Sequence, residues 1–351
     1  MSGNSVQVER AMGRKTFLFF AKASLISTLV LIFVGAIVRV TGAGMGCPDW
    51  PTCWGCLIPP THVEQVEFEQ LDIAKFQRKA ERLGRDPKTI SVESLRAEFN
   101  PRHVWTEFIN RLFSLPVGLF SLLTFVASFG QRSRRPALFA ASFLALLLVL
   151  VNAWMGARVV YSGLAPGVLT LHMAMAFLLI LVQTWIVWRA ADVAWHPSFV
   201  DRRIVSRLRW IVGVLFLIVV AEGIMGSQVR ELTDAMSKHM SVARSEWGPA
   251  LENSWLYLTH RSFSWLILLM ALYAWRLARR GRKSPLHLCE KLVIGIVLLQ
   301  MVLGVVMSQI HIYGWVQVLH VGLAALLISG NFFWLLGLLS RSSSPPSHNQ
   351  T

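Results

Sequence analysis

The stretch "LTLHMAMAFLLI" (169–180) decides the fold, because it sets His172 inside a run that is apolar enough to enter a bilayer. Nearly the same order of residues returns at 317–328 as "QVLHVGLAALLI", with His320 at the corresponding place. The chain therefore repeats a membrane segment that carries a histidine at one depth.

The composition around these segments is that of a membrane protein that crosses the bilayer several times. Of the 351 residues, 54% are hydrophobic and only 15% are charged. Apolar runs predict an all-α fold of eight transmembrane helices. The expected spans are 17–40, 105–129, 137–160, 168–189, 210–229, 255–276, 291–310 and 315–339.

The net charge of +15 is placed as in a membrane protein rather than in a nucleic-acid-binding protein. Basic clusters such as "QRSRRP" (131–136) and "RLARRGRK" (276–283) occupy alternate connections, which marks those connections as cytoplasmic. The connections "YSGLAPG" (161–167) and "HIYGW" (311–315) contain no Lys or Arg and are expected outside. This topology predicts termini in the cytoplasm, or in a mitochondrial matrix, and lipid as the surrounding partner. A bacterial inner membrane is expected in preference to a mitochondrial one.

The repeat extends along the whole chain. Matching residues recur at offsets of 148, 150 and 191 positions, and a repeat of this kind predicts two similar halves. The matched pairs are Asn152 with Gln300, Gly156 with Gly304, Asn110 with His260, Arg111 with Arg261, and Arg39 with Arg230. We expect residues 1–190 and 191–340 to form two pseudo-symmetric four-helix bundles, followed by a disordered cytoplasmic tail over 341–351.

The long outer connection, about 41–104, contains three of the four cysteines. In "GCPDWPTCWGC" the spacing and the oxidising compartment favour a disulfide between Cys47 and Cys53, with Cys56 as a competing partner. Cys289, on the cytoplasmic side, is expected to be a reduced thiol. The remainder of the connection mixes both charge signs at helical spacing, which predicts a solvated pair of amphipathic helices.

Three of the ten histidines, His172, His260 and His320, lie inside predicted spans, roughly 6–9 Å from the outer ends at helical rise. A polar side chain at that depth indicates function, whereas a histidine bonded to a neighbouring helix is the structural alternative. His260 and His320 lie on alternate spans that begin on the same side. They can therefore face each other, and two opposed imidazoles suit six-coordinate haem iron.

The residues near these histidines fit a porphyrin. Small residues such as Ala174 and Gly322 follow the histidines and would leave room for a flat macrocycle between helices. Four arginines near the outer ends are candidates to pair with haem propionates: Arg39, Arg111, Arg230 and Arg261. For Arg39 and Arg230, ordinary snorkelling to the interface is the alternative.

Glu107 is the acid inside the outer half of an N-terminal span, one helical turn before Asn110 on the same face. A carboxylate in this position beside a prosthetic group could carry protons or stabilise a cation. The alternative is that Glu107 lies shallow enough to stay hydrated.

At this point the sequence resembles the heme A synthases. "VRVTGAGMGCPDWPTCWG" (38–55) is similar to that family's signature, and "EFINR" (107–111), "THR" (259–261) and "LH" (319–320) follow in the family's order. The resemblance implies an oxidoreductase that converts the C8 methyl of heme O to a formyl group, making heme A for terminal oxidases. Heme O, a heme O synthase and an electron-transfer protein are the implied partners, and self-association stays open.

The resemblance also implies roles for individual residues. A resident heme b would be held by His260 and His320 beside Arg261, whereas the N-terminal half would bind heme O. The residues implied for that second site are the iron ligand His172, the catalytic Glu107, Asn110 and Arg111, with the Cys47–Cys53 disulfide outside. One motif departs from the family: the expected Glu-x-x-His-Arg has Asn110 in place of its histidine.

Two other functions compete with the enzyme. A haem-binding oxidase-assembly factor without turnover is consistent with the missing histidine at Asn110. A membrane electron-transfer cytochrome b would need two matched bis-histidine sites, whereas this chain has one complete pair, His260 and His320.

Overall fold

The computed structural model describes residues 3–82, 86–191, 201–239, 246–280, 282 and 285–340. This part of the chain is built from helices, and each predicted span overlaps one long helix. The long helices are α1 (Gly3–Val40), α4 (Pro101–Ser128), α5 (Pro136–Tyr161), α6 (Val168–Ala190), α7 (Arg202–His239), α9 (Trp255–Arg280), α10 (Leu288–Gln309) and α11 (Gly314–Leu339). The tail expected at 341–351 lies outside the described residues.

Seven helices in the described part of the chain are long and apolar enough to cross a membrane: α1, α4, α5, α6, α7, α10 and α11. Helix α9 is also 26 residues long, but it is not among the seven. Its first turns contain "THRS" (259–262), and its last turns contain three arginines, all of which lower its hydropathy. The all-helical membrane fold predicted from the sequence is therefore confirmed, with seven spans identified by composition where eight were expected.

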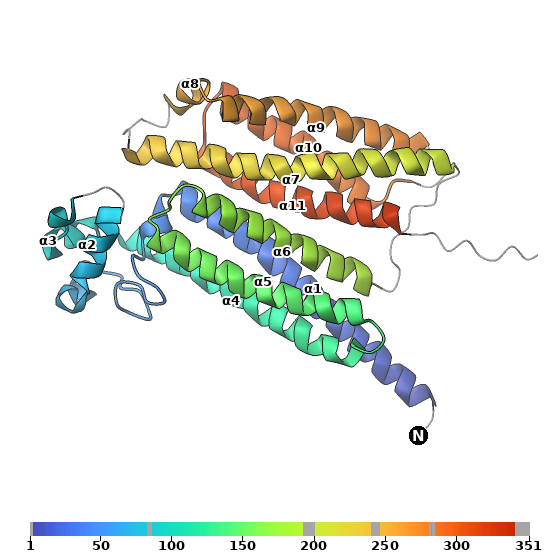
Figure 1. Cartoon of the computed structure of the whole chain (residues 1–351), viewed down its shortest axis with the longest axis horizontal. Helices are drawn as coiled ribbons and strands as arrows, with labels where there is room; N and C mark the ends of the chain where they lie inside the picture. Colours follow the sequence, from blue (N-terminus) through green and yellow to red (C-terminus); the bar gives the residue numbers. More distant parts are fainter. Residues whose placement is uncertain are drawn as a thin grey trace, which may run out of the picture.

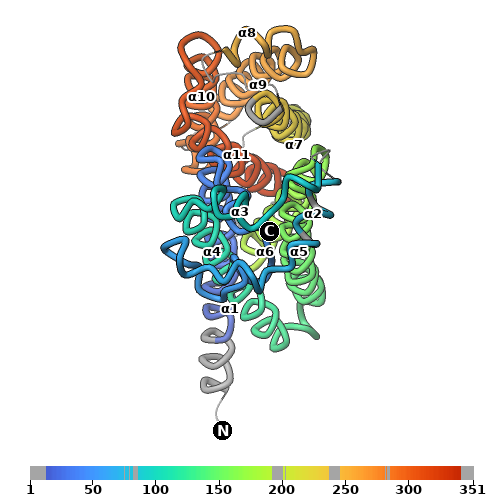
Figure 2. The backbone as a smooth tube through the Cα atoms, turned by 90° about the vertical axis from the view of Figure 1, so that its left-hand side faces the viewer, coloured from blue at the N-terminus to red at the C-terminus, as the bar shows by residue number. Residues whose placement is uncertain are grey.

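The long helices pack as two groups (Figure 1). In the first group, α1 and α5 each contact both α4 and α6. In the second, α7 and α10 each contact both α9 and α11. Consequently α4 lies diagonally across from α6, and α9 lies diagonally across from α11. Figure 2, turned by 90°, shows the groups side by side, with α11 meeting α1 and α6 between them.

Helix α6 is held at its first turn by a residue of the other group. It begins after Gly167, whose φ of 81° suits glycine, and its first amides lack partners within the helix. Glu231 of α7 accepts hydrogen bonds from the Gly167 and Thr170 amides at 3.1 and 3.0 Å. The carboxylate also opposes the positive end of the helix dipole. It thereby fixes the segment that carries His172 against α7.

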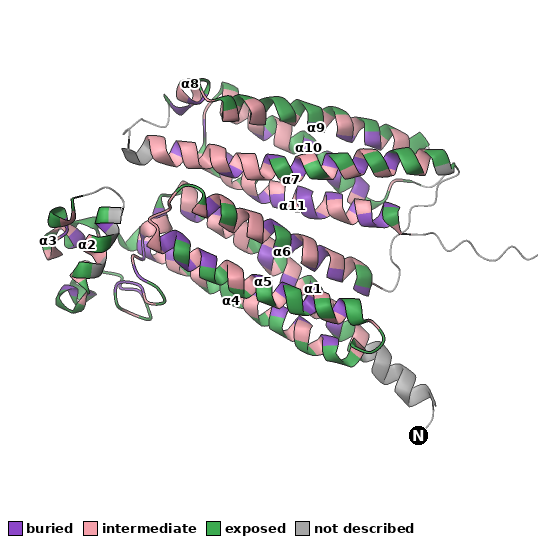
Figure 3. Ribbon diagram, viewed as in Figure 1, coloured by how far each residue is buried: buried purple, intermediate pink, exposed green. Residues whose placement is uncertain are grey.

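Close packing joins the two groups where α11 meets α1. A Cβ added to Gly322 of α11 would overlap the ring of Phe33 from α1. The expectation that Gly322 leaves room for a macrocycle is therefore wrong, because an aromatic ring already fills that space. Elsewhere, the outward faces of the helices are exposed (Figure 3) and apolar, as at Trp154 and Leu269. Such faces suit contact with lipid.

The connection between α1 and α4 folds over the first turns of α4. It contains two short helices, α2 (Ile73–Arg82) and α3 (Val92–Glu98), which confirms the predicted helix pair. Trp54, Phe68 and Leu95 are buried in its own apolar core, which also includes both sulfurs of the Cys47–Cys53 disulfide. The structure thus forms the favoured disulfide and leaves Cys56 and Cys289 as thiols.

Candidate functional site

The structure brings His260 of α9 and His320 of α11 together between diagonal helices. Their ring centroids are 6.3 Å apart and their planes are inclined at 81°. Two imidazoles bound to one metal ion from opposite sides, with each nitrogen about 2 Å from it, place their ring centres roughly 6 Å apart. The spacing of this pair therefore fits an iron between the rings.

Buried polar atoms without hydrogen-bond partners mark the same level in both helix groups. Six of them belong to the three residue pairs that the sequence repeat matches: Asn110 Oδ1 with His260 Nδ1, His172 Nδ1 with His320 Nδ1, and Asn152 Oδ1 with Gln300 Oε1. Leaving such atoms unsatisfied costs about 1–3 kcal/mol each, so native proteins rarely tolerate them without a functional reason. Their matched positions fit one polar or metal-containing group in each bundle.

Glycines bring the neighbouring helices close to these residues. A Cβ at Gly226 of α7 would lie 3.2 Å from His260 Cε1, and one at Gly35 of α1 would lie 3.7 Å from Asn110 Oδ1. The offset of 191 positions that pairs Arg39 with Arg230 also pairs these two glycines. Gly156 of α5 approaches His172 in the same way, at 3.8 Å from Cε1. His260, Asn110 and His172 therefore each face a glycine that keeps a helix backbone close, whereas Gly304, the repeat partner of Gly156, has open space around its Cβ.

One acidic residue of this site, Glu222 on α7, was not predicted from the sequence. Its Oε1 lies 3.1 Å from His260 Nδ1, and its side chain is largely buried. The contact has ion-pair distance, although the ring N–H is not aligned with the carboxylate as a hydrogen bond. An acid inside the apolar run "VLFLIVVAEGIMG" (214–226) is the signal that could have identified it.

Glu107 is almost completely buried, at 4% exposure, and both of its oxygens have partners. Oε2 accepts the backbone N–H of Cys47 at 2.7 Å, and Oε1 pairs with Arg111 Nη2 at 2.7 Å. The alternative of a hydrated, shallow Glu107 is therefore wrong. The carboxylate joins α4 to the disulfide loop at the outer end of the first helix group.

Arg111 binds the same loop through its backbone. Besides Glu107, its guanidinium donates to four carbonyl oxygens: Thr52 at 2.9 Å, Asp49 at 3.0 Å, Cys47 at 3.3 Å and Pro51 at 3.5 Å. A planar group with five N–H donors suits such a set of acceptors. The residue predicted to meet a propionate thus holds the disulfide loop in place.

Arg39 and Arg230, which the repeat pairs, meet at the junction of the two helix groups. Arg39 lies 2.6 Å from one oxygen of Asp234, and Arg230 lies 3.0 Å from the other. Arg230 also donates to Gln317 Oε1 at 2.7 Å and to the Arg39 carbonyl at 2.9 Å. These arginines are mostly buried and paired, so simple snorkelling to water does not describe them.

Arg261 is directed differently from its repeat partner, Arg111. Its side chain is 42% exposed, with Nη1 3.7 Å from Glu252 and the guanidinium 5.7 Å from the Tyr257 ring centre. An exposed pair of this kind contributes little stability. The cation therefore lies on an exposed face near the start of α9.

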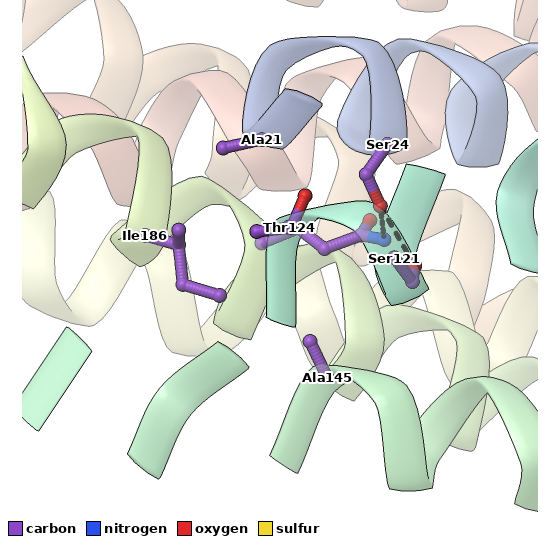
Figure 4. A pocket seen from close by; sticks show the side chains of 7 residues that line it. Ala21, Ser24, Ser121, Thr124, Ala145 and Ile186 are labelled. Atoms are coloured by element: carbon purple, nitrogen blue, oxygen red, sulfur yellow. Dashed lines mark hydrogen bonds between the residues drawn. The ribbon is translucent and has the colours of Figure 1, made fainter. Parts of the chain in front are cut away.

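A further polar cluster lies deeper in the first helix group (Figure 4). Ser24 and Ser121 hydroxyls are 2.8 Å apart, and Gln183 Nε2 donates to Ser24 at 2.9 Å. Gln183 lies eleven residues after His172 on α6, about 16 Å along the helix. This cluster binds α1, α4 and α6 together and is separate from the histidine level.

Comparison with known proteins identifies the relatives of the chain. It is 22% identical to a protein named heme A synthase from Wolbachia pipientis over 91% of this chain and 92% of the relative. The heme A synthase of Sphingopyxis alaskensis is 26% identical, covering 86% of each chain. That of Rickettsia prowazekii is 29% identical over 45% of this chain and 44% of its own. Residues 19–330 match the family described as cytochrome oxidase assembly protein, and the chain belongs to this family.

Proposed function

We propose that this protein is a heme A synthase, an oxidoreductase that acts on a CH group of heme O. The reaction replaces two hydrogens of the C8 methyl by one oxygen and leaves a formyl group. The observation that carries the proposal is the half-buried His260–His320 pair between diagonal helices, in a chain whose relatives over most of its length are named heme A synthase. The protein is a multi-pass protein of the bacterial inner membrane.

The proposed topology has eight spans, with α9 as the eighth. Helix α9 packs against α7 and α10 and has the length of its neighbours, which supports a transmembrane position. Both termini then lie in the cytoplasm. This orientation is supported by the basic clusters at 131–136 and 276–283 and by outer connections without Lys or Arg.

The proposed division of labour assigns one haem to each half, residues 1–190 and 191–340. The diagonal pairs α4 with α6 and α9 with α11 occupy equivalent places in the two helix groups, which supports a pseudo-symmetric duplication. The matched unsatisfied atoms and the matched glycines, Gly35 and Gly226, support it further.

In the C-terminal half, His260 and His320 would hold a resident heme b. Such a haem supplies one-electron transfer when bound. Further along α9 and α11, Ile267 and Ala325 belong to a buried apolar core, which would help to keep water away from the haem. Arg261, exposed at the outer end of α9, is placed where its guanidinium can turn toward a propionate.

In the N-terminal half, His172 would bind the iron of heme O, with Asn110 on the diagonal helix. Glu107 would act at the outer edge of this site, where the contacts with Arg111 and the Cys47 amide fix its carboxylate. A fixed carboxylate can stabilise positive charge that develops on the substrate or accept a proton from it. Arg111 positions that carboxylate and the loop above it.

One observation favours a second function, a haem-binding assembly factor without turnover. Asn110 stands where the repeat places His260 in the other half, and a carboxamide is a weaker iron ligand than an imidazole. Such a factor would bind heme O without changing it. A membrane electron carrier is less well supported, since the described residues bring together one complete histidine pair, His260 and His320.

Haem analysis separates these functions. The chain is expressed with a heme O synthase in cells that lack their own heme A synthase, and extracted haems are separated by chromatography. We expect a formyl haem with the wild type and heme O alone with His172→Ala. Heme O alone with the wild type, in membranes where the protein is present and folded, would support the assembly factor and reject the enzyme.

A further inference from the structure

Glu222 is a buried acid that the proposed reaction does not use. It lies in the apolar middle of α7, and its exposure is 8%. A carboxylate at this depth in a membrane segment is costly and is retained where it has a function. The residue that corresponds to it in the first half, at the offset of 191 positions, is Leu31. The acid therefore belongs to the C-terminal half alone.

The contacts of Glu222 direct its carboxylate toward one histidine. Oε1 lies 3.1 Å from His260 Nδ1 and accepts a hydrogen bond from Ser264 Oγ at 3.1 Å. The Ser264 hydroxyl also lies 3.0 Å from the His260 carbonyl oxygen, so its one hydrogen is shared between two acceptors and links the carboxylate to the helix that carries the ring. Gly226, one turn after Glu222, allows the ring to approach α7.

We propose that Glu222 is a positioning residue for the resident haem: it holds the Nδ1–H of His260, directs Nε2 toward the iron and lowers the haem's reduction potential. The inference rests on the proposed haem site at His260 and His320. Histidines that bind metal usually donate their other ring N–H to a carboxylate, a carbonyl or water. The 3.1 Å between Glu222 Oε1 and His260 Nδ1 is a hydrogen-bond distance.

The reduction potential follows from charge and hydrogen bonding. A carboxylate that accepts the Nδ1–H makes the imidazole a stronger donor to iron, and its negative charge favours the oxidised haem. Both effects lower the reduction potential. The low dielectric of the membrane interior strengthens them. The N-terminal half has Leu31 at the corresponding position and therefore no such carboxylate.

The test is a redox titration of the low-spin haem in purified full-length protein. Glu222→Gln keeps the size of the side chain and removes its charge. We expect at least a tenfold higher ratio of reduced to oxidised haem at a fixed potential, which is a rise of about 59 mV for one electron. Ser264→Ala removes a donor from the same carboxylate oxygen, so the Nδ1–H bond strengthens and the potential falls.

Glu69→Gln is the control, because it removes the same charge from an exposed side chain of the segment between α1 and α4. It should leave the potential close to that of the wild type. Equal potentials in the wild type, Glu222→Gln and Ser264→Ala would overturn the inference. If Glu222→Gln retains no haem, the Ser264→Ala variant decides: a lower potential supports the inference, and an unchanged one rejects it.

A separate spectrum distinguishes failure of this inference from failure of the haem site. Loss of the low-spin spectrum in His260→Ala, together with an unchanged potential in Glu222→Gln, rejects only the role of Glu222. An unchanged low-spin spectrum in His260→Ala rejects the haem site itself, and the role of Glu222 with it.

Discussion

Replacing Glu107 with glutamine separates the structural from the chemical role of this residue. The carboxylate accepts the Cys47 amide at 2.7 Å and pairs with Arg111 at 2.7 Å. A glutamine side chain has one acceptor oxygen, so it can keep only one of these two contacts. The disulfide loop should therefore open more often, whereas the haem pair on α9 and α11 should be unaffected.

The expected size of the effect follows from the lost contact. An unsatisfied buried partner costs about 1–3 kcal/mol, and hydrogen exchange of the Cys47 amide should accelerate about 5- to 150-fold. Exchange is measured by mass spectrometry on the peptide that contains residues 46–55, in purified protein with intact disulfide. Glu69→Gln, an exposed carboxylate of the same outer segment, is the control and should change stability by less than about 0.5 kcal/mol.

Two results would refute different parts of this reasoning. Exchange in Glu107→Gln equal to that in Glu69→Gln would mean that Glu107 does not hold the loop. Faster exchange with heme A still formed at the wild-type rate would keep the structural role and reject the proposed chemical role of Glu107.

Three further variants test the site and the fold. His172→Ala should retain the resident low-spin spectrum while heme O accumulates; loss of that spectrum would contradict the division between the halves. Asn110→His should convert the iron of bound heme O to low-spin bis-histidine, in spectra from which the resident haem is subtracted, unless the wild-type site is already low-spin. Gly322→Ala should destabilise the protein by about 1–3 kcal/mol in thermal unfolding, because its Cβ overlaps Phe33. Gly304→Ala, with open space around its Cβ, should not; equal melting of both variants would contradict the packing.

The sequence was sufficient to predict the helices and the meeting of two histidines. Apolar runs determine where helices cross a bilayer, so every long helix overlaps a predicted span. The meeting of His260 with His320 followed from their equal depth on alternate spans. The spacing of the cysteines and the oxidising compartment favoured the Cys47–Cys53 disulfide. The sequence alone left Cys56 as an alternative partner, and the fold decided between them.

Contacts between distant helices were not predictable. Hydropathy shows which segments enter the membrane but not which side chains meet, so Asp234 between Arg39 and Arg230 was missed. Phe33 in the space beside Gly322 was missed for the same reason, because their helices are separated by nearly the whole chain. Glu222 differs, since an acid in an apolar run is visible in the sequence alone.

The most direct test of the central claim is the fate of heme O added to isolated membranes that contain this protein and no heme O synthase. Haems are extracted at successive times and their masses are measured by mass spectrometry, with His172→Ala membranes as the control. The proposed function predicts a product that has lost two hydrogens and gained one oxygen at a methyl group, formed only by the wild type. Heme O that keeps its mass in wild-type membranes, while the low-spin resident spectrum is present, would contradict it.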